Sequence, residues 1–195
     1  MSITVKICGV SSRDDVAAVE AAGADAVGFV FTDSIRKVSP EQAAEASVDV
    51  GILKIAVMKH PSPELVQHVL EVFQPDIVQT DAADFAGLSI PDSIRRWPVY
   101  REGNAQLNPV GEYVYEGKSS GSGETVDWHR AAAIAERGQM ILAGGLAEDN
   151  VGEAILTVRP VGIDVSSGVE SLPGYKDYEL IRRFVAAVRA AEKNL

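Results

Sequence analysis

Eight short runs rich in valine and isoleucine recur along this chain of 195 residues. They begin near Ile3, Ala26, Leu53, Ile77, Val99, Tyr113, Met140 and Val161. Segments with helical periodicity separate most of the runs, and the clearest span 14–22, 62–73, 128–136, 148–158 and 177–191. Regular alternation of strands and helices predicts a parallel α/β fold. Eight strands predict a closed (βα)8 TIM barrel, formed by a single domain over 1–195.

The chain is short for such a barrel, which typically needs about 250 residues. Only a polar stretch, 101–110, separates the fifth and sixth strand candidates, and it is marked by asparagine and proline. We therefore expect the fifth helix to be shortened or missing. The alternative architecture is an open doubly wound sheet, but the first turn reads CGVSSRDD and lacks the G-x-G-x-x-G fingerprint.

The chain is acidic, with a formal net charge of −10 and a pI of about 4.8. On average it repels a nucleic-acid backbone, so we expect no nucleic-acid partner, and local features must bind a small anionic substrate. No run approaches the roughly 20 apolar residues that span a membrane, and the N-terminus lacks the features of an export signal. With Cys8 as its single cysteine the chain forms no internal disulfide, so we expect a cytoplasmic protein without a membrane partner.

The first strand candidate carries Lys6 and Cys8 two residues apart. Side chains alternate along a strand, so both should face the barrel lumen while Val5 and Ile7 pack toward the helices. A buried lysine needs a carboxylate partner, and Asp164 in the neighbouring eighth strand is a candidate. The ammonium group would favour a Cys8 thiolate, which is a usable base at neutral pH. The alternative is that Cys8 is only a small buried hydrophobic residue.

Two strand ends in the second half of the chain are rich in glycine and serine. MILAGGL closes with Gly144 and Gly145, and DVSSGVE contains Ser166, Ser167 and Gly168. Loops after the seventh and eighth strands of such barrels commonly bind phosphate through backbone N–H groups. The loops after the third and fourth strand candidates read KHPSPE and QTDAAD and contain no glycine pair. The sequence therefore predicts one phosphate site.

Arg36 and Glu116 each follow or end a strand candidate at the expected mouth of the barrel. Arg36 could grip a carboxylate with two parallel hydrogen bonds, or it is a solvated surface arginine. Glu116 ends the sixth strand, where barrels carry catalytic side chains, or it only begins a polar loop. The loop that follows, KSSGSGET, could act as a mobile lid. His60, His68 and His129 lack metal-binding spacing, so we expect no metal site.

Seven sequence blocks occur in order along the chain: KICGV, GADAVGFVF, SIRKVSPEQA, DIVQ, GSGETVDW, LAGGLAEDNV and DVSSGVES. Together they resemble phosphoribosylanthranilate isomerase over nearly the whole chain. The resemblance implies a (βα)8 barrel that uses no cofactor and acts in tryptophan biosynthesis. It also implies an Amadori rearrangement, which converts N-(5′-phosphoribosyl)anthranilate into 1-(2-carboxyphenylamino)-1-deoxyribulose 5-phosphate.

The resemblance further implies a role for each matching residue. Cys8 would be the general base, and Arg36 would bind the anthranilate carboxylate. Glu116 would be the general acid, kept protonated by partial burial. Asp164 would lie close to the site. The phosphate would be held by the residues of the two loops, namely Gly144, Gly145, Ser166, Ser167 and Gly168.

Three positions depart from the family pattern. The family's general acid is an aspartate, and Glu116 is one methylene longer. A displacement of about 1 Å can cost on the order of 100-fold in rate. The family commonly has His-Gly after the Val-Gln of the fourth strand, where this chain has Thr80 and Asp81 following Gln79. The loop that carries Arg36 is one residue shorter than the commonest family version.

Three alternatives stay open at this point. A bifunctional isomerase would also accept the histidine-pathway substrate, which carries two phosphates, but the first half of the chain has no glycine pair for the second phosphate. A phosphosugar-binding barrel with little catalysis is kept open by Glu116. A redox-sensing role for Cys8 is disfavoured by its expected place inside the barrel. The sequence is compatible with either a monomer or a homodimer.

Overall fold

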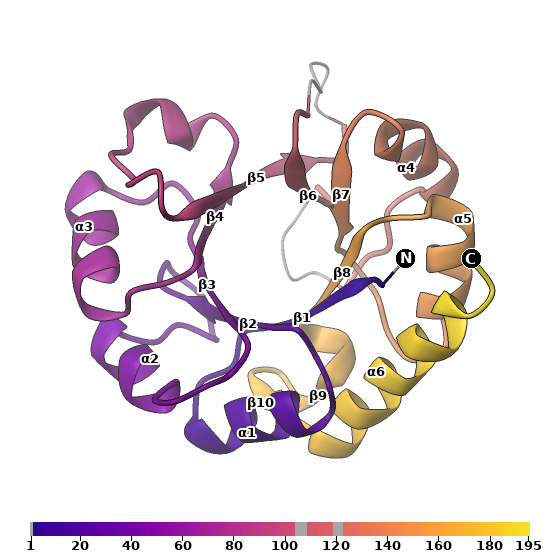
Figure 1. Ribbon diagram of the computed structural model, residues 1–195, viewed down its shortest axis with the longest axis horizontal. Coiled ribbons are helices and arrows are strands. Elements are labelled where there is room, and N and C mark those ends of the chain that lie inside the picture. The colour runs from indigo at the N-terminus through magenta and orange to yellow at the C-terminus, as the bar shows by residue number, and fades with distance from the viewer. Residues whose placement is uncertain (1, 104–108, 119–122) are drawn as a thin grey trace.

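Eight parallel strands close into a barrel in a computed structural model that describes residues 2–103, 109–118 and 123–195 (Figure 1). Each strand pairs with its neighbours in chain order, and β8 closes the ring by pairing with β1. The strands are β1 (Thr4–Cys8), β2 (Ala26–Val30), β3 (Leu53–Val57), β4 (Ile77–Asp81), β5 (Arg95–Arg101), β6 (Glu112–Glu116), β7 (Gln139–Leu142) and β8 (Gly162–Val165). The predicted (βα)8 barrel is confirmed.

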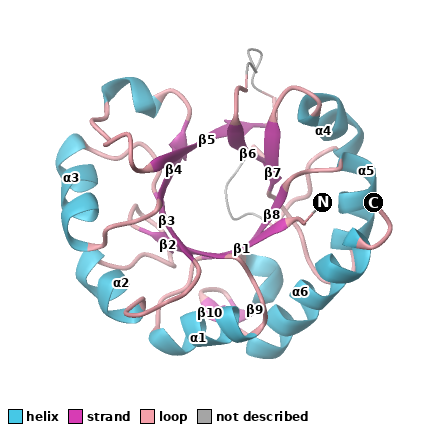
Figure 2. Cartoon of the chain, in the orientation of Figure 1, coloured by secondary structure: helices cyan, strands magenta, loops and turns pink. Residues whose placement is uncertain are grey.

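The helices form an outer ring around the strands (Figure 2). They are α1 (Arg13–Ala21), α2 (Pro40–Ala46), α3 (Pro63–Val72), α4 (Trp128–Ala135), α5 (Val151–Val158) and α6 (Tyr178–Glu192). Between β4 and β5 the chain forms only the 3₁₀ turn η1 (Asp84–Gly87). Between β5 and β6 the described residues, 102–103 and 109–111, form no helix. The expectation that the fifth helix is shortened or missing is therefore confirmed, and the fourth helix is reduced to η1.

Helix α2 was not identified from periodicity because its seven residues span only two turns. Its start nevertheless carries a clear local signal. Ser39 and Gln42 form a reciprocal capping box, and Pro40 occupies the first turn. The cap fixes where the chain turns back after the loop that carries Arg36.

The buried side chains form two layers because side chains alternate along each strand. Val5, Ile7 and similar outward-facing residues pack against the helices in the larger layer. The smaller layer fills the lumen with Ala26, Ile55, Ile77, Trp97, Val99, Val114, Ile141 and Ala143. The lumen-facing rows continue toward the carboxyl ends of the strands, where polar residues replace the apolar ones. The packed lumen is therefore a floor for a site at that end of the barrel.

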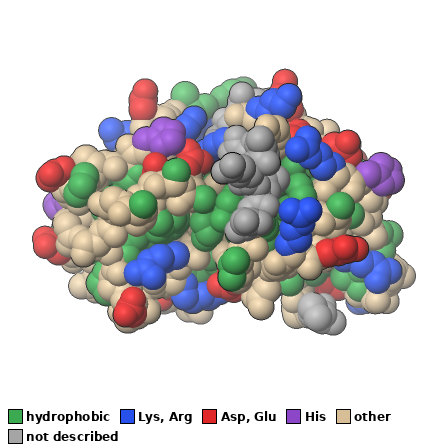
Figure 3. All heavy atoms as spheres, turned by 90° about the horizontal axis from the view of Figure 1, so that it is seen from above, with side chains coloured by type: hydrophobic (Ala, Val, Ile, Leu, Met, Phe, Trp, Pro, Cys, Tyr) green, Lys and Arg blue, Asp and Glu red, His purple; other side chains and the backbone are tan. Residues whose placement is uncertain are grey.

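The chain after β8 adds a short hairpin to the same end of the barrel. The 3₁₀ turn η2 (Ser167–Val169) leads into β9 (Glu170–Leu172), which pairs antiparallel with β10 (Tyr175–Lys176). Acidic and basic side chains are interspersed on the face of the molecule seen in Figure 3. Among the described residues, no helix combines the length and apolar character that a membrane crossing requires.

An aromatic cluster outside β2 offers a test of the outer layer. Phe73, 1% exposed, lies with its ring centroid 5.1 Å from that of Phe29 and 5.3 Å from that of Phe31. Phe73→Ala should lower the free energy of unfolding by about 3–5 kcal/mol, because it removes a buried ring and leaves a cavity. The exposed Glu71→Ala on α3 should change it by less than about 0.5 kcal/mol. Denaturant unfolding measures both, and equal effects of the two substitutions would contradict this packing.

Candidate active site

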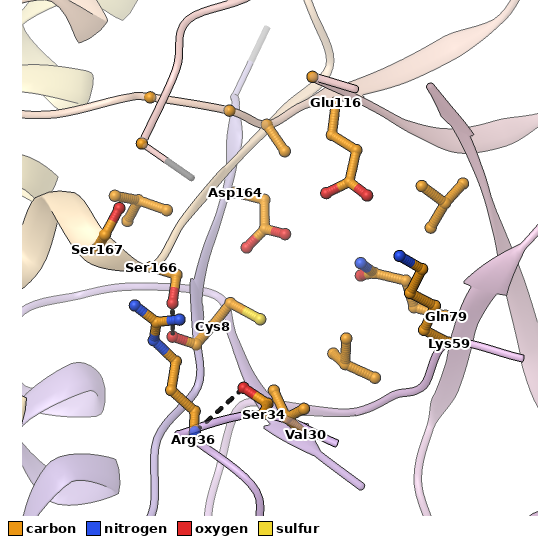
Figure 4. A pocket seen from close by; sticks show the side chains of 18 of the residues that line it. Cys8, Val30, Ser34, Arg36, Lys59, Gln79, Glu116, Asp164, Ser166 and Ser167 are labelled. Carbon is orange, nitrogen blue, oxygen red and sulfur yellow. Dashed lines mark hydrogen bonds between the residues drawn. The ribbon is translucent and has the colours of Figure 1, made fainter. Parts of the chain in front are cut away.

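A cavity of about 260 Å³ opens at the carboxyl ends of the strands (Figure 4). It is the place where the lumen-facing rows of the barrel change from apolar to polar side chains. Its polar lining includes Cys8, Arg36, Gln79, Arg101, Glu116 and Asp164. In (βα)8 barrels this end of the strands carries the active site, because loops from different strands converge there.

A buried ion pair between Lys6 and Asp164 supports the floor of the cavity. The two residues are paired positions in β1 and β8, and the Lys6 Nζ atom lies 2.7 Å from Asp164 Oδ2. Lys6 is fully buried, so the ammonium group needs this partner, as the sequence predicted. Burial alone would lower the pKa of Lys6, but Asp164 and Cys8 raise it overall. Lys6 therefore stays charged beside Cys8.

Cys8 lies at the end of β1 with its sulfur directed into the cavity (Figure 4). Its pKa lies above the usual value for a thiol. Burial is the largest cause, and the Asp164 charge adds to it, while the ammonium groups of Lys6 and Lys176 act in the opposite direction. Sequence reasoning expected the ammonium to favour a thiolate, but Lys6 is already paired with Asp164. In the free protein Cys8 is therefore mainly a thiol at neutral pH.

The loops after β7 and β8 face the cavity side by side and are closely packed. Gly144 and Gly145 both have positive φ, and the structure gives their N–H groups no acceptor among the described residues. A Cβ on Gly145 would lie 2.5 Å from the Thr125 backbone nitrogen, and one on Gly168 would lie 2.0 Å from the Leu146 carbonyl oxygen. Glycine is required at both positions because the backbones approach so closely. The unoccupied N–H donors suit a phosphate.

The two serines of the β8 loop differ in their contacts. The Ser166 hydroxyl donates to the Cys8 carbonyl oxygen at 3.0 Å, so it ties the β8 loop to the end of β1. Ser167 also lines the cavity, and its hydroxyl has no hydrogen-bond partner among the described residues. Ser167 is therefore the better placed of the two to donate its hydroxyl proton to a bound anion.

Arg36 crosses from the β2 loop to the β9 strand and forms a bidentate ion pair with Glu170. Arg36 Nε and Nη2 donate to the two Glu170 oxygens at 2.6 and 2.8 Å. Lys176 Nζ and the Gly174 N–H also donate to Glu170. Burial alone would raise the pKa of Glu170, but Arg36, Lys176 and Gly174 together lower it to about 2. Glu170 is thus a fixed anion that orients Arg36. The second edge of the guanidinium, Nη1 with Nη2, remains able to grip a carboxylate.

Glu116 ends β6 with its carboxylate directed into the cavity (Figure 4). It forms an ion pair with Arg101, its paired position in β5. Arg101 in turn contacts Asp81 at the end of β4, with Nε and Nη2 at 3.0 and 2.8 Å from Oδ1. A guanidinium therefore lies against the Glu116 carboxylate inside the cavity.

Asp81 and two further side chains, His60 and Asp84, bring metal-binding atom types together at the rim. The ligand atoms of His60, Asp81 and Asp84 lie within 4.8 Å of one another. These atoms already have partners in the chain, with Thr80 and His60 on Asp84 and Arg101 on Asp81. The cluster is thus explained as a hydrogen-bonded extension of the Arg101 ion pair. His60 itself is 65% exposed and faces the rim.

Two buried acceptor oxygens in the cavity have no donor among the described residues. They are Oδ1 of Asp164 and the side-chain oxygen of Gln79. Both residues line the cavity, and Figure 4 shows their polar groups directed into it. A buried polar atom without a partner is costly. A ligand with hydroxyl groups would satisfy both oxygens.

Sequence reasoning missed Glu170, Lys176 and the link from Arg101 to Asp81. Glu170 is separated from Arg36 by 134 positions, so no spacing could have connected them. In the sequence Arg101 begins a polar connection, whereas in the structure it ends a strand beside the one that carries Glu116. The predicted lid, KSSGSGET, lies partly outside the described residues, which omit 119–122.

Comparison with known proteins agrees with this architecture. A family model described as N-(5'phosphoribosyl)anthranilate (PRA) isomerase matches residues 5–187. The N-(5'-phosphoribosyl)anthranilate isomerase of Roseiflexus sp. (strain RS-1) is 37% identical over 213 residues, covering 97% of this chain and 99% of the relative.

Two solved structures are also similar over nearly their full length. A monomeric form of the dimeric phosphoribosylanthranilate isomerase of Thermotoga maritima has a TM-score of 0.82 at 30% identity, covering 96% of this chain and 99% of that one. A phosphoribosylanthranilate isomerase in complex with reduced 1-(o-carboxyphenylamino)-1-deoxyribulose 5-phosphate has a TM-score of 0.74 at 29% identity, with the same coverage.

A closed barrel with a polar cavity at the carboxyl ends of its strands is the architecture of (βα)8-barrel enzymes. Within that class, this chain belongs to the N-(5'-phosphoribosyl)anthranilate isomerase family. The family predicted from the sequence blocks is therefore confirmed.

The close contact of the two glycine-rich loops can be tested with Gly168→Ala. The added Cβ would push the β8 loop away from Leu146 and displace the N–H donors. Losing one hydrogen bond to a charged group costs about 1.5–3 kcal/mol, so binding of ribose 5-phosphate should weaken roughly ten- to hundredfold. Gly152→Ala is the matched control, because nothing lies within 4 Å of its added Cβ. A titration that gives equal dissociation constants for Gly168→Ala and wild type would refute the phosphate role of this loop.

The protonation state of Cys8 can be measured directly because the chain has one cysteine. The rate of alkylation by iodoacetamide, followed by mass, should rise with pH to a midpoint above the usual thiol pKa, since only the thiolate reacts. Lys176→Met should move the midpoint further up, because the Lys176 ammonium lowers the pKa of Cys8. A wild-type midpoint below the usual value would show that the ammonium groups outweigh burial.

Proposed function

We propose that this chain catalyses the Amadori rearrangement of N-(5′-phosphoribosyl)anthranilate to 1-(2-carboxyphenylamino)-1-deoxyribulose 5-phosphate. The observation that carries the proposal is the arrangement of one cavity. A thiol on β1 and a carboxyl group on β6 project into it. The loops after β7 and β8 close its other side, where the N–H groups of Gly144 and Gly145 have no acceptor among the described residues. Acid and base therefore flank the space beside a phosphate site, as this isomerisation requires.

The substrate would span the cavity with its phosphate on the β7 and β8 loops. Gly144, Gly145, Ser167 and Gly168 would form the phosphate site, with Ser166 joining that loop to β1. The ribose hydroxyls would donate to Asp164 and Gln79, whose buried oxygens lack other donors among the described residues. The anion is thus bound by local groups although the chain carries a net charge of −10.

Arg36 would bind the anthranilate carboxylate through the guanidinium edge that Glu170 leaves open. Fixing one edge of the guanidinium on an anion reduces the entropy lost when the other edge binds a ligand. Arginine suits this task better than lysine because its planar fork matches a carboxylate. Glu170 and Lys176, buried in the same network, would maintain the orientation of Arg36.

In the reaction, the protonated Glu116 would donate to the ribose ring oxygen, and the C1–O bond would break to give an open-chain Schiff base. The Cys8 thiolate would then remove the proton from C2. The electron pair of that C–H bond would form the C1=C2 bond of an enolamine, while the π electrons of the C1=N bond return to the nitrogen. Tautomerisation of the enolamine gives the ketone product. Each proton that leaves one atom is accepted by another, so the step needs no oxidant or reductant.

In the state that reacts, Glu116 is protonated and Cys8 is a thiolate, so these two groups together carry one proton. In the free protein burial favours a thiol at Cys8, while Arg101 pairs with the Glu116 carboxylate. Formation of the productive state thus moves one proton from the thiol side of the cavity to the carboxyl side. The groups that surround Glu116 determine how readily this happens.

We further propose that one domain, 1–195, carries the whole activity in the cytoplasm as a monomer or homodimer, without cofactor or metal. The related Thermotoga maritima protein is described as dimeric. The bifunctional alternative, which needs a second phosphate site, is disfavoured because the loops after β3 and β4 offer no glycine pair.

The isomerase activity is tested by turnover of freshly prepared phosphoribosylanthranilate, followed by loss of its anthranilate fluorescence. Wild type should be active, Cys8→Ser should lose nearly all activity, and Glu116→Gln should lose about 100-fold or more, since general acid–base groups typically contribute this much. Glu116→Asp compares the two carboxyl lengths.

Wild-type protein that binds a product analogue but shows no turnover would sink the isomerase proposal. A phosphosugar-binding barrel would then be the better description. Activity that survives in Cys8→Ser would retain the reaction but remove Cys8 as its base.

A further inference from the structure

The side chain of Glu116 is held at the mouth by the strand beside it. Glu116 and Arg101 are paired positions at the ends of β6 and β5, and both follow lumen-facing valines, Val114 and Val99, by two residues. The alternation of side chains therefore directs both groups into the same cavity. Their ion pair forms inside the pocket, where the two side chains are only about 15% exposed.

Arg101 is fixed from its other side by Asp81. Nε and Nη2 of Arg101 lie 3.0 and 2.8 Å from the same Asp81 oxygen, at the end of β4. Asp81 is anchored in turn, because its second oxygen lies 3.3 Å from Nε2 of His60. The guanidinium is thus clamped between carboxylates from the two neighbouring strands.

Taken by themselves, Asp81, Arg101 and Glu116 carry two carboxylates and one guanidinium, and so one surplus negative charge. When Glu116 takes up a proton, Arg101 keeps an anionic partner in Asp81 and the pair is neutral. If Asp81 were uncharged, protonation of Glu116 would leave neither of these two carboxyl groups charged beside the guanidinium. A positive charge beside a carboxyl group favours its ionised form, so Asp81 offsets the effect of Arg101 on Glu116.

We propose that Arg101 and Asp81 are positioning residues for Glu116. Arg101 fixes the side chain of Glu116, which is longer than an aspartate, over the substrate. Asp81 shares the guanidinium of Arg101, so that Glu116 can carry the proton. The proposal rests on the proposed isomerase function and extends it to two residues to which the family resemblance assigns no role. A glutamate has one more rotatable bond than an aspartate, so its carboxyl group needs an anchor that an aspartate does not.

The test compares kcat and KM for Asp81→Asn, Arg101→Met and Arg101→Lys with wild type. Asp81→Asn and Arg101→Met should each lower kcat about 10- to 100-fold with KM changed less than about threefold, because the acid step is affected and substrate binding is not. Arg101→Lys keeps the positive charge but loses the planar guanidinium that contacts both carboxylates. It should therefore recover part of the kcat that is lost in Arg101→Met.

A double-substitution series separates positioning from a general structural effect. In Glu116→Gln the acid is already absent, so adding Asp81→Asn or Arg101→Met should lower kcat no further. If the losses instead multiply in the double variants, Arg101 and Asp81 do not act through Glu116 and the proposal is overturned.

The barrel provides a matched control at its opposite end. Arg95, at the start of β5, forms an ion pair with Glu112 at the start of β6. Arg95→Met removes a β5–β6 ion pair outside the cavity, so kcat and KM should stay at wild-type values. Unchanged kcat in Asp81→Asn and Arg101→Met, with active wild type, would refute the positioning role alone. An inactive wild type would instead refute the isomerase function.

Discussion

The buried ion pair between Lys6 and Asp164 is the contact on which the rest of the site depends. It joins the first and last strands where the barrel closes, and it is isolated from solvent because the Lys6 side chain is fully buried. Breaking such a pair by removing one partner leaves an uncompensated buried charge, so both residues must be present together. Cys8 lies two positions beyond Lys6 on the same strand face. The ion pair therefore lies where β1 and β8 close the barrel, directly below the expected base.

Much of this arrangement could be predicted from the sequence because it depends on short-range periodicity. Alternation along β1 places Lys6 and Cys8 in the lumen, and the order of the strands makes Asp164 their neighbour. The capped helix α2 was missed because seven residues give too little periodicity. The pairing of Arg36 with Glu170 could not be predicted, since it depends on how two loops from distant parts of the chain meet.

The direction of the Cys8 pKa shows a different limit of sequence reasoning. The sequence places an ammonium group near the thiol, but it does not say how that charge is already used. In the structure Asp164 neutralises Lys6, and burial then outweighs the remaining attraction. An ionisable group in a dry cavity responds to the net charge of its surroundings and to desolvation together. The identity of one neighbour is therefore insufficient to tell whether the pKa of Cys8 is raised or lowered.

Two of the departures from the family pattern meet on one side of the cavity. In the sequence Asp81 and Glu116 are 35 positions apart and look like unrelated changes. In the barrel they lie on either side of Arg101, which contacts both. A longer carboxyl side chain on β6 and a new carboxylate on β4 thus share one cation. Substitutions in direct contact are expected to be coupled in their effects. Judging Glu116 by its length alone therefore omits Arg101, which pairs with it, and Asp81, which shares that partner.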